Sequence, residues 1–158
     1  MRIRHVLTAL ALAPFLAQCA GTDLTQVVPS DKVKTSTRDA AQAAALISEY
    51  RKARGLGPVT VDTTLNGAAE YQARAVAEAG KLSHGAFASR MAGFKIGGYS
   101  AENLSAGSDS VGGAIARWKA SPGHNENLLM PQARRIGLAR ADSPGNGYER
   151  YWALVLAQ

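Results

Sequence analysis

Apolar side chains return every three or four positions in three stretches of this chain. Each stretch follows a residue that can cap a helix and ends at a glycine or proline that can stop one. The stretches run from Thr37 to Gly55, from Asp62 to Gly80, and from Ser108 or Asp109 to Pro122. The pattern therefore predicts three amphipathic helices, and residues 125–129 predict one further short helical turn.

A different pattern marks the carboxyl-terminal part of the chain. Residues 135–141 alternate large and small side chains, and residues 151–156 are almost continuously apolar. Turn-forming residues at 142–147 separate them, so the two segments predict a β-hairpin. Glycines punctuate a loop at 93–98, which leads into a short extended segment at 99–105. Helices mixed with a hairpin predict an α+β fold, in which helices cover both faces of a small, mostly antiparallel sheet.

The first residues have the pattern of an export signal. Arg2 and Arg4 precede an apolar run at 6–17 that is too short to span a bilayer comfortably. Cys19 is the only cysteine, and Leu16-Ala-Gln-Cys19 resembles the bacterial lipobox, in which the cysteine carries diacylglycerol. We therefore expect residues 1–18 to be a signal peptide, with Cys19 as the first mature residue and a lipid anchor to the membrane. An ordinary secreted protein with an incidental cysteine is the alternative.

Residues 19–36 are rich in polar residues and predict a flexible tether, which leaves 37–158 as one folded domain. Loss of Arg2 and Arg4 with the leader lowers the formal charge of the chain from +6 to +4. This mild excess fits a solvated surface or contact with anionic lipids or wall polymers. No basic run is interleaved with aromatic residues and no zinc-finger spacing occurs, so we expect no nucleic acid partner.

The candidate chemistry lies in three short polar motifs. The chain has three histidines, and the two outside the leader are both in these motifs. The motifs are Leu82-Ser-His84, Ala101-Glu102-Asn103-Leu104 and Gly123-His124-Asn-Glu-Asn127, the last of which follows Trp118. A fold that brought the motifs together would place two imidazoles beside a carboxylate.

Together with Arg135-Ile-Gly-Leu-Ala139 and Tyr151-Trp-Ala153, these motifs resemble the CAP superfamily, also called SCP-like. The family includes cysteine-rich secretory proteins, antigen five, plant pathogenesis-related one and short bacterial members, and the resemblance covers about residues 40–157. It implies a three-layer α-β-α sandwich in which His84, Glu102 and His124 line one cleft. Many eukaryotic members have a second cleft glutamate just after the tryptophan, where this chain has Lys119-Ala-Ser121.

Each cleft residue can also be interpreted structurally. Two neutral imidazoles, His84 and His124, could hold Zn²⁺ weakly, because catalytic zinc sites usually have three protein ligands. Glu102 is the candidate catalytic acid or base, but a buried carboxylate bonded to its surroundings is equally compatible. Asn103 and Asn127 are further candidate cleft residues, and they are expected to brace loops through side-chain hydrogen bonds to the backbone. Glu126 is expected to point to solvent, and Trp118 and Trp152 are expected in the core.

These expectations converge on an exported cell-envelope protein. Its ligand would be a lipid or other hydrophobic small molecule, a cell-wall component or a partner protein, bound in the His-Glu-His cleft and rimmed by the loop at 93–98. The alternatives are a metal-assisted hydrolase that uses the same residues, and a structural envelope protein with a vestigial cleft. The missing second acid favours binding over hydrolysis.

Overall fold

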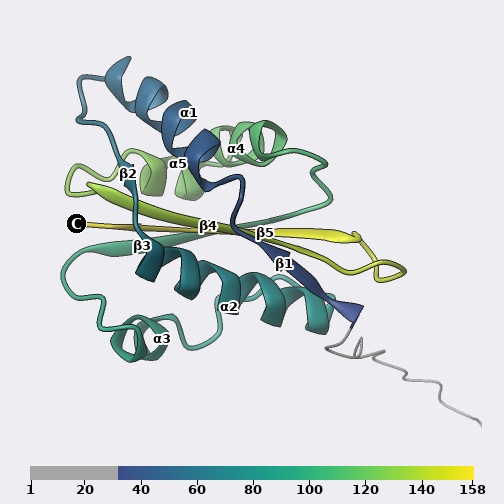
Figure 1. Ribbon diagram of the computed structural model, residues 1–158. Helices are drawn as coiled ribbons and strands as arrows, with labels where there is room; N and C mark the ends of the chain where they lie inside the picture. Colours follow the sequence, from purple (N-terminus) through teal and green to yellow (C-terminus); the bar gives the residue numbers. More distant parts are fainter. Residues whose placement is uncertain (1–31) are drawn as a thin grey trace, which may run out of the picture.

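Within residues 32–158, which this computed structural model describes, five strands form one sheet with helices on both faces (Figure 1). The strands are β1 (Lys34–Ser36), β2 (Thr60–Val61), β3 (Ser100–Ala106), β4 (Arg135–Asp142) and β5 (Arg150–Ala157). The order across the sheet is β1-β4-β5-β3, and β2 adds a short parallel pairing to β4. The other pairings are antiparallel, which leaves β3 at one edge.

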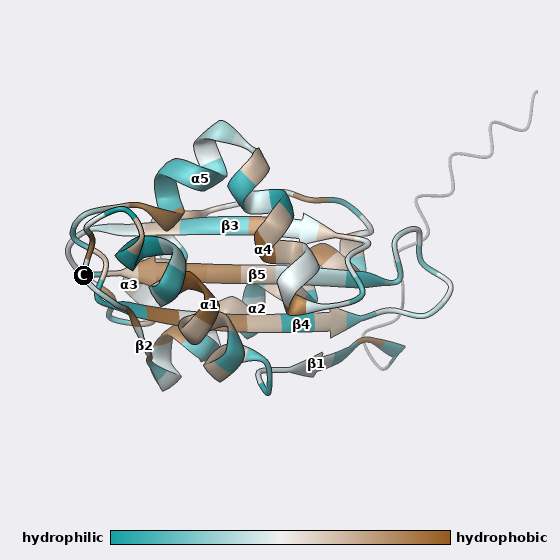
Figure 2. Cartoon of the chain, turned by 90° about the horizontal axis from the view of Figure 1, so that it is seen from above, coloured by the Kyte–Doolittle hydropathy of each residue, from teal (hydrophilic) through white to brown (hydrophobic). Residues whose placement is uncertain are grey.

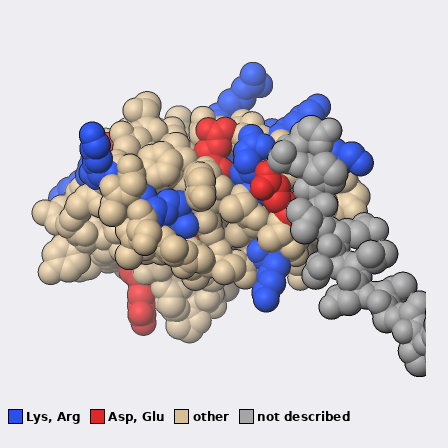
Figure 3. Space-filling view, turned by 90° about the horizontal axis from the view of Figure 1, so that it is seen from below, with Lys and Arg blue, Asp and Glu red and all other residues tan. Residues whose placement is uncertain are grey.

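Two helical layers enclose this sheet. Figure 1 shows α2 and α3 below it and α1, α4 and α5 above it. The helices are α1 (Ala40–Lys52), α2 (Thr63–Ala79), α3 (Phe87–Gly93), α4 (Val111–Ala120) and α5 (Pro122–Leu128). No helix among the described residues is both long and apolar enough to cross a membrane. Figure 3 views the face formed by α2 and α3, where most of the surface is neither acidic nor basic.

The central strand β5 supplies side chains to two separate cores. Because successive strand residues point to opposite faces, its positions alternate between the two layers. Tyr151, Ala153 and Val155 pack with α2, whereas Trp152, Leu154 and Leu156 pack with α1 and α4. Figure 2 shows β5 as an apolar strand along most of its length. This explains the nearly continuous apolar sequence, since both faces of the strand are buried.

The close approach of α2 to β4 depends on Gly137. A Cβ atom at this position would lie 1.9 Å from the carbonyl carbon of Leu65 and 2.2 Å from the nitrogen of Asn66. Asp62 caps α2 by accepting the N–H of Leu65, and it also accepts a 2.7 Å hydrogen bond from Arg135. Burial alone would raise the pKa of Asp62, but these donors stabilise the carboxylate and lower the pKa.

The three long helices, the hairpin and the α-β-α sandwich are confirmed, and three local predictions need correction. The folded part begins before residue 37, because Lys34–Ser36 form β1 and pair with β4 instead of belonging to a tether. The glycine-rich segment is preceded by a helix, α3, that we did not predict. The last short helix begins at Pro122, since proline is well suited to the first turn. The predicted leader, Cys19 and the start of the tether lie outside the described residues.

Candidate functional site

Strand β3 presents two of the predicted site residues to opposite sides of the sheet. Leu104 and Ala106 of this strand belong to the core beneath α2, so Glu102, two residues earlier, faces the same side. Asn103 faces the layer of α5. Both side chains are buried although β3 is an edge strand, because the loop after α2 and helix α5 cover that edge.

Both carboxylate oxygens of Glu102 are engaged. Oε1 lies 2.9 Å from Nδ1 of His84, and Oε2 accepts a 2.5 Å hydrogen bond from Nη2 of Arg90. The side chains of Glu102 and Arg90 are 1% and 6% exposed, so the ion pair is almost completely shielded from water. Arg90 also donates from Nη1 to the carbonyl oxygen of His84 at 3.2 Å. The charge of the Glu102 carboxylate is therefore balanced by Arg90, and its other oxygen orients His84.

The contact with Glu102 determines how His84 can act. A neutral imidazole that donates Nδ1–H to a carboxylate keeps a lone pair on Nε2, which can then accept a proton or bind a metal. The side chain of His84 is 54% exposed, so this nitrogen can be reached from solvent. The loop that carries His84 is held by Gln72, whose Nε2 donates to the carbonyl oxygen of Ser83 at 2.5 Å. Gly80 starts this loop in the left-handed conformation, at φ +61°.

Two asparagines hold α5 against β3. Asn103 donates from Nδ2 to the carbonyl oxygen of His124 at 2.9 Å. Asn127 donates from Nδ2 to Oδ1 of Asn103 at 2.9 Å and to the carbonyl oxygen of Glu102 at 3.3 Å. Both side-chain amides thus brace the backbone of α5 and β3 and not that of loops, and the amide of Asn103 fixes the position of His124.

His84 and His124 are close enough for their charges to interact. Burial lowers the pKa of His124 below its ordinary value, and the positive charge of His84 lowers it further. Both effects favour the neutral form of His124. No three His, Cys, Asp or Glu side chains within 32–158 are arranged to hold a metal ion, and Glu102 already uses both oxygens. A zinc site with three protein ligands does not fit this arrangement, and weak zinc binding by the two imidazoles stays a prediction.

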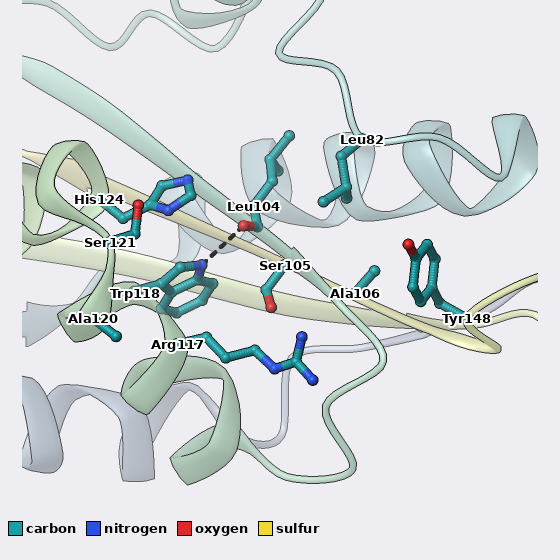
Figure 4. A pocket seen from close by; sticks show the side chains of 10 residues that line it. All are labelled: Leu82, Leu104, Ser105, Ala106, Arg117, Trp118, Ala120, Ser121, His124 and Tyr148. Atoms are coloured by element: carbon teal, nitrogen blue, oxygen red, sulfur yellow. Dashed lines mark hydrogen bonds between the residues drawn. The ribbon is translucent and has the colours of Figure 1, made fainter.

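A cavity of about 410 Å³, which we call the edge cavity, lies next to His124 at the β3 edge (Figure 4). Leu82, Leu104, Trp118 and Tyr148 form its apolar wall. The indole N–H of Trp118 donates to the carbonyl oxygen of Leu104 at 3.0 Å, which fixes the ring. The remaining lining residues are small or polar: Ser105, Ala106, Arg117, Ala120, Ser121 and His124. Apolar walls with a few polar groups are typical of small-molecule sites.

The remaining predictions about the site are correct for single residues and wrong for the glycine-rich loop. Trp118 and Trp152 are buried as predicted, and Glu126 is exposed on α5. The loop at 93–98 does not line the edge cavity, because α3 carries it to the other helical layer. Arg90 was not predicted as a site residue, and neither was α3, the helix that carries it. The spacing of Phe87 and Met91, i and i+4, is typical of a helical turn and could have revealed α3.

The fold and the motifs agree with a family assignment. The model of the cysteine-rich secretory protein family, CAP, matches residues 44–156. The chain therefore belongs to the CAP family. No match is found among curated proteins.

Solved structures of bacterial proteins share this fold. An outer surface protein from Borrelia burgdorferi superposes with a TM-score of 0.69 at 22% identity, covering 78% of this chain and 95% of that protein. An extracellular protein containing an SCP domain from Bacillus anthracis superposes with a TM-score of 0.64 at 21% identity, covering 74% of this chain and 39% of that protein. A cysteine-rich secretory protein from Staphylococcus aureus superposes with a TM-score of 0.58 at 20% identity, covering 73% of this chain and 37% of that protein. The chain thus spans less than half of the last two proteins.

Proposed function

We propose that this protein is an exported cell-envelope protein that binds a lipid-like or wall-derived ligand, or a partner protein, in the edge cavity. The observation that carries the proposal is the composition of this cavity. Trp118 and Leu104 provide an apolar wall, and Arg117 and His124 stand beside it. Its volume of about 410 Å³ falls within the range usual for small-ligand sites. An amphipathic molecule with a polar or anionic end fits this combination.

The contacts of Glu102 favour binding over hydrolysis. A general base needs a free oxygen within reach of a water molecule, whereas His84 and Arg90 occupy both oxygens of Glu102. Ser105 and Ser121 line the cavity, but within 32–158 neither is hydrogen-bonded to an imidazole that could activate it. Glu102 therefore acts by orienting His84 and anchoring Arg90, and the site presents groups for recognition.

The rival function is metal-assisted hydrolysis, in which His84 and His124 would hold the ion. The pair of Glu102 and His84 favours it, because a carboxylate commonly orients a metal-binding histidine. Neither His84 nor Glu102 lines the edge cavity, whereas His124 does. Replacement of His124 by glutamine therefore separates the two functions. A hydrolase would lose turnover by orders of magnitude, whereas a binding protein would change only its affinity. A structural protein would show neither turnover nor ligand binding.

Tryptophan fluorescence can test binding directly, since Trp118 lines the edge cavity and Trp152 is in the core. In a Trp152→Phe background, dihexanoyl phosphatidylglycerol or muramyl dipeptide should change the emission of Trp118 in a saturable way. Ala120→Phe, which fills the cavity, should remove the change. Ala116→Phe, on the exposed side of α4, should preserve it. If neither probe gives a saturable change, the edge cavity is not a site for these ligand classes.

Export and lipid anchoring are a separate part of the proposal. They are supported by Leu16-Ala-Gln-Cys19, and by the similarity of the fold to an outer surface protein and to an extracellular protein. The wild-type protein should incorporate labelled palmitate and fractionate with membranes. Cys19→Ser should do neither. A wild-type protein recovered wholly in the soluble fraction, with its amino terminus at Ala20 or later, would exclude the anchor.

A further inference from the structure

The charge that lines the edge cavity comes from a single side chain. Within residues 32–158, Arg117 is the only lysine, arginine, aspartate or glutamate in the lining. It lies in the last turn of α4, where its side chain is exposed. The cavity therefore offers one permanent positive charge to a ligand and no negative charge that would oppose an anion.

No acid of the described part of the chain balances this charge. Arg90, Arg135 and Arg150 are each paired with a carboxylate, whereas Arg117 forms no ion pair within residues 32–158. Glu102 is engaged by His84 and Arg90 on the side of α2 and α3. Because a guanidinium carries only hydrogen-bond donors, Arg117 is suited to an acceptor that arrives with the ligand.

Ser105 places a second donor on the same cavity. Its residue is only 5% exposed in β3, yet it belongs to the lining. Figure 4 shows its hydroxyl directed towards the side on which the guanidinium of Arg117 lies. A hydroxyl hydrogen rotates to suit its partner, so Ser105 can donate to a group that Arg117 holds.

Two exposed apolar side chains complete the lining. Leu82 is 42% exposed and Tyr148 is 61% exposed, and both contribute to the wall of the edge cavity. Leu82 comes from the loop after α2, and Tyr148 comes from the turn between β4 and β5. A hydrocarbon chain that covered them would remove apolar surface from water. The site thus combines one unpaired cation with accessible apolar surface.

We propose that the edge cavity selects an amphipathic molecule whose head carries one negative charge, a carboxylate or a phosphodiester. The head accepts hydrogen bonds from Arg117 and Ser105, and the apolar part packs against Leu82 and Tyr148. A head with two negative charges would leave one of them uncompensated beside an apolar wall, which is unfavourable. This inference rests on the function proposed for the edge cavity, and it makes Arg117 the residue that determines specificity.

Paired probes test the charge of the head. Dihexanoyl phosphatidylglycerol and dihexanoyl phosphatidylcholine have the same acyl chains and phosphodiester, but choline cancels the negative charge. Octanoate and methyl octanoate form a second pair. Titrations below the critical micelle concentration, followed by Trp118 emission in the Trp152→Phe background, should show that each anion binds about fivefold or more tightly than its partner.

Variants of Arg117 assign the preference to this side chain. Arg117→Gln should abolish it by weakening the anions alone, whereas Arg117→Lys should retain part of it because the charge remains. Arg54→Gln removes an equal charge at an exposed position outside the cavity and should retain all of it. Leu82→Ser should weaken both members of a pair to the same extent. A larger effect of Arg117→Gln on octanoate assigns the head to a carboxylate, and a larger effect on phosphatidylglycerol assigns it to a phosphodiester.

The outcomes separate this inference from the proposed function. Equal, saturable binding of charged and neutral partners, removed by Ala120→Phe, would overturn the inference and leave the edge cavity as a ligand site. An anion preference that persists in Arg117→Gln, at a wild-type melting temperature, would also overturn it. If none of the four probes binds, the inference and the proposed small-ligand site both fail.

Discussion

Glu102 and Asn103 are neighbours on β3, yet they connect the strand to different helical layers. Glu102 bonds to His84 and Arg90 on the side of α2 and α3, whereas Asn103 bonds to the backbone of His124 on α5. Because the side chains of adjacent strand residues point in opposite directions, this dipeptide can hold the loop of His84 on one side of the sheet and α5 on the other. The two histidines approach each other around the edge of the sheet as a result.

Replacement of Glu102 by glutamine tests this arrangement. The amide has nearly the same shape but no charge, so Arg90 would be left as a buried, uncompensated cation. The free energy of unfolding should fall by about 3–5 kcal/mol. Glu126→Gln, at an exposed position on α5, should change it by less than about 0.5 kcal/mol. Urea denaturation measures both.

A double variant distinguishes a missing charge partner from a missing contact. Glu102→Gln combined with Arg90→Met removes both charges, so its loss of stability should be smaller than the sum of the two single losses. Additive losses would show that the ion pair itself contributes little.

Arg51 offers a second test, because it is fully buried and pairs with no carboxylate within residues 32–158. Its guanidinium donates to four carbonyl oxygens at 2.8–3.1 Å: those of Gly57, Leu128, Met130 and Ala133. Burial lowers its pKa, and so does the charge of nearby Arg134. Arg51→Met should cost about 3 kcal/mol or more in urea denaturation, because several buried acceptors lose their donor. The exposed Arg54→Met should be nearly neutral, and equal effects would contradict the proposed role.

Gly137 is expected to be intolerant of any side chain. A Cβ would overlap the backbone of Leu65 and Asn66, so α2 would have to move away from β4. Gly137→Ala should cost more than about 3 kcal/mol, measured by thermal or urea unfolding. Gly112→Ala is the control, because its Cβ has open space in a helix and should be neutral or stabilising. A wild-type melting temperature for Gly137→Ala would contradict the close approach.

The sequence was informative where an element buries a regular face. The spacing of Leu65, Ala68 and Val76 predicted α2, and the apolar run at 151–156 predicted β5, because both elements pack along most of their length. The short strands β1 and β2 escaped prediction. Their two or three residues are partly exposed and are strands only because β4 lies beside them. Such pairing is a tertiary effect that no local pattern encodes.

The site was predictable in its motifs but not in its contacts. Glu102 and His84 could be chosen because carboxylate and imidazole chemistry stands out in the sequence. Arg90 could not be selected, since nothing local distinguishes it from the solvated Arg54. The burial of Arg51 was hidden for the same reason. Charged residues at helix ends are usually exposed, so only the tertiary structure reveals which of them are enclosed.

The pH dependence of stability should carry a contribution from His124. Its pKa is lowered in the folded protein by burial and by His84, whereas the unfolded chain titrates near its ordinary pKa of about 6.5. Between these two values the unfolded state binds more protons, so stability falls as pH decreases through this interval. Above about pH 8 both states are neutral at this residue, and the contribution vanishes.

His124→Gln should remove this dependence. Urea denaturation at pH 7.5 and pH 5.5 should show a smaller loss of stability on acidification than in the wild type. An NMR titration of the His124 ring gives the folded pKa directly, and His84→Gln should raise it by removing a neighbouring positive charge. A His124 pKa at or above about 6.5 in the wild type would contradict the expected direction.

The last prediction concerns zinc at the two histidines. Two protein ligands are fewer than the usual three, so binding should be weak, and it should weaken further below about pH 6 as the imidazoles take up protons. The lowered pKa of His124 delays its protonation and favours ligation. Competition with a zinc-sensitive dye measures the affinity. His84→Ala and His124→Ala should each abolish binding, and the double variant should lose scarcely more, because either loss already destroys a two-ligand site. Glu126→Ala, which removes an exposed acid near His124, should retain it. If each single variant keeps the wild-type affinity, the histidines do not share an ion, and the pair of Glu102 and His84 serves only to orient one imidazole for ligand recognition.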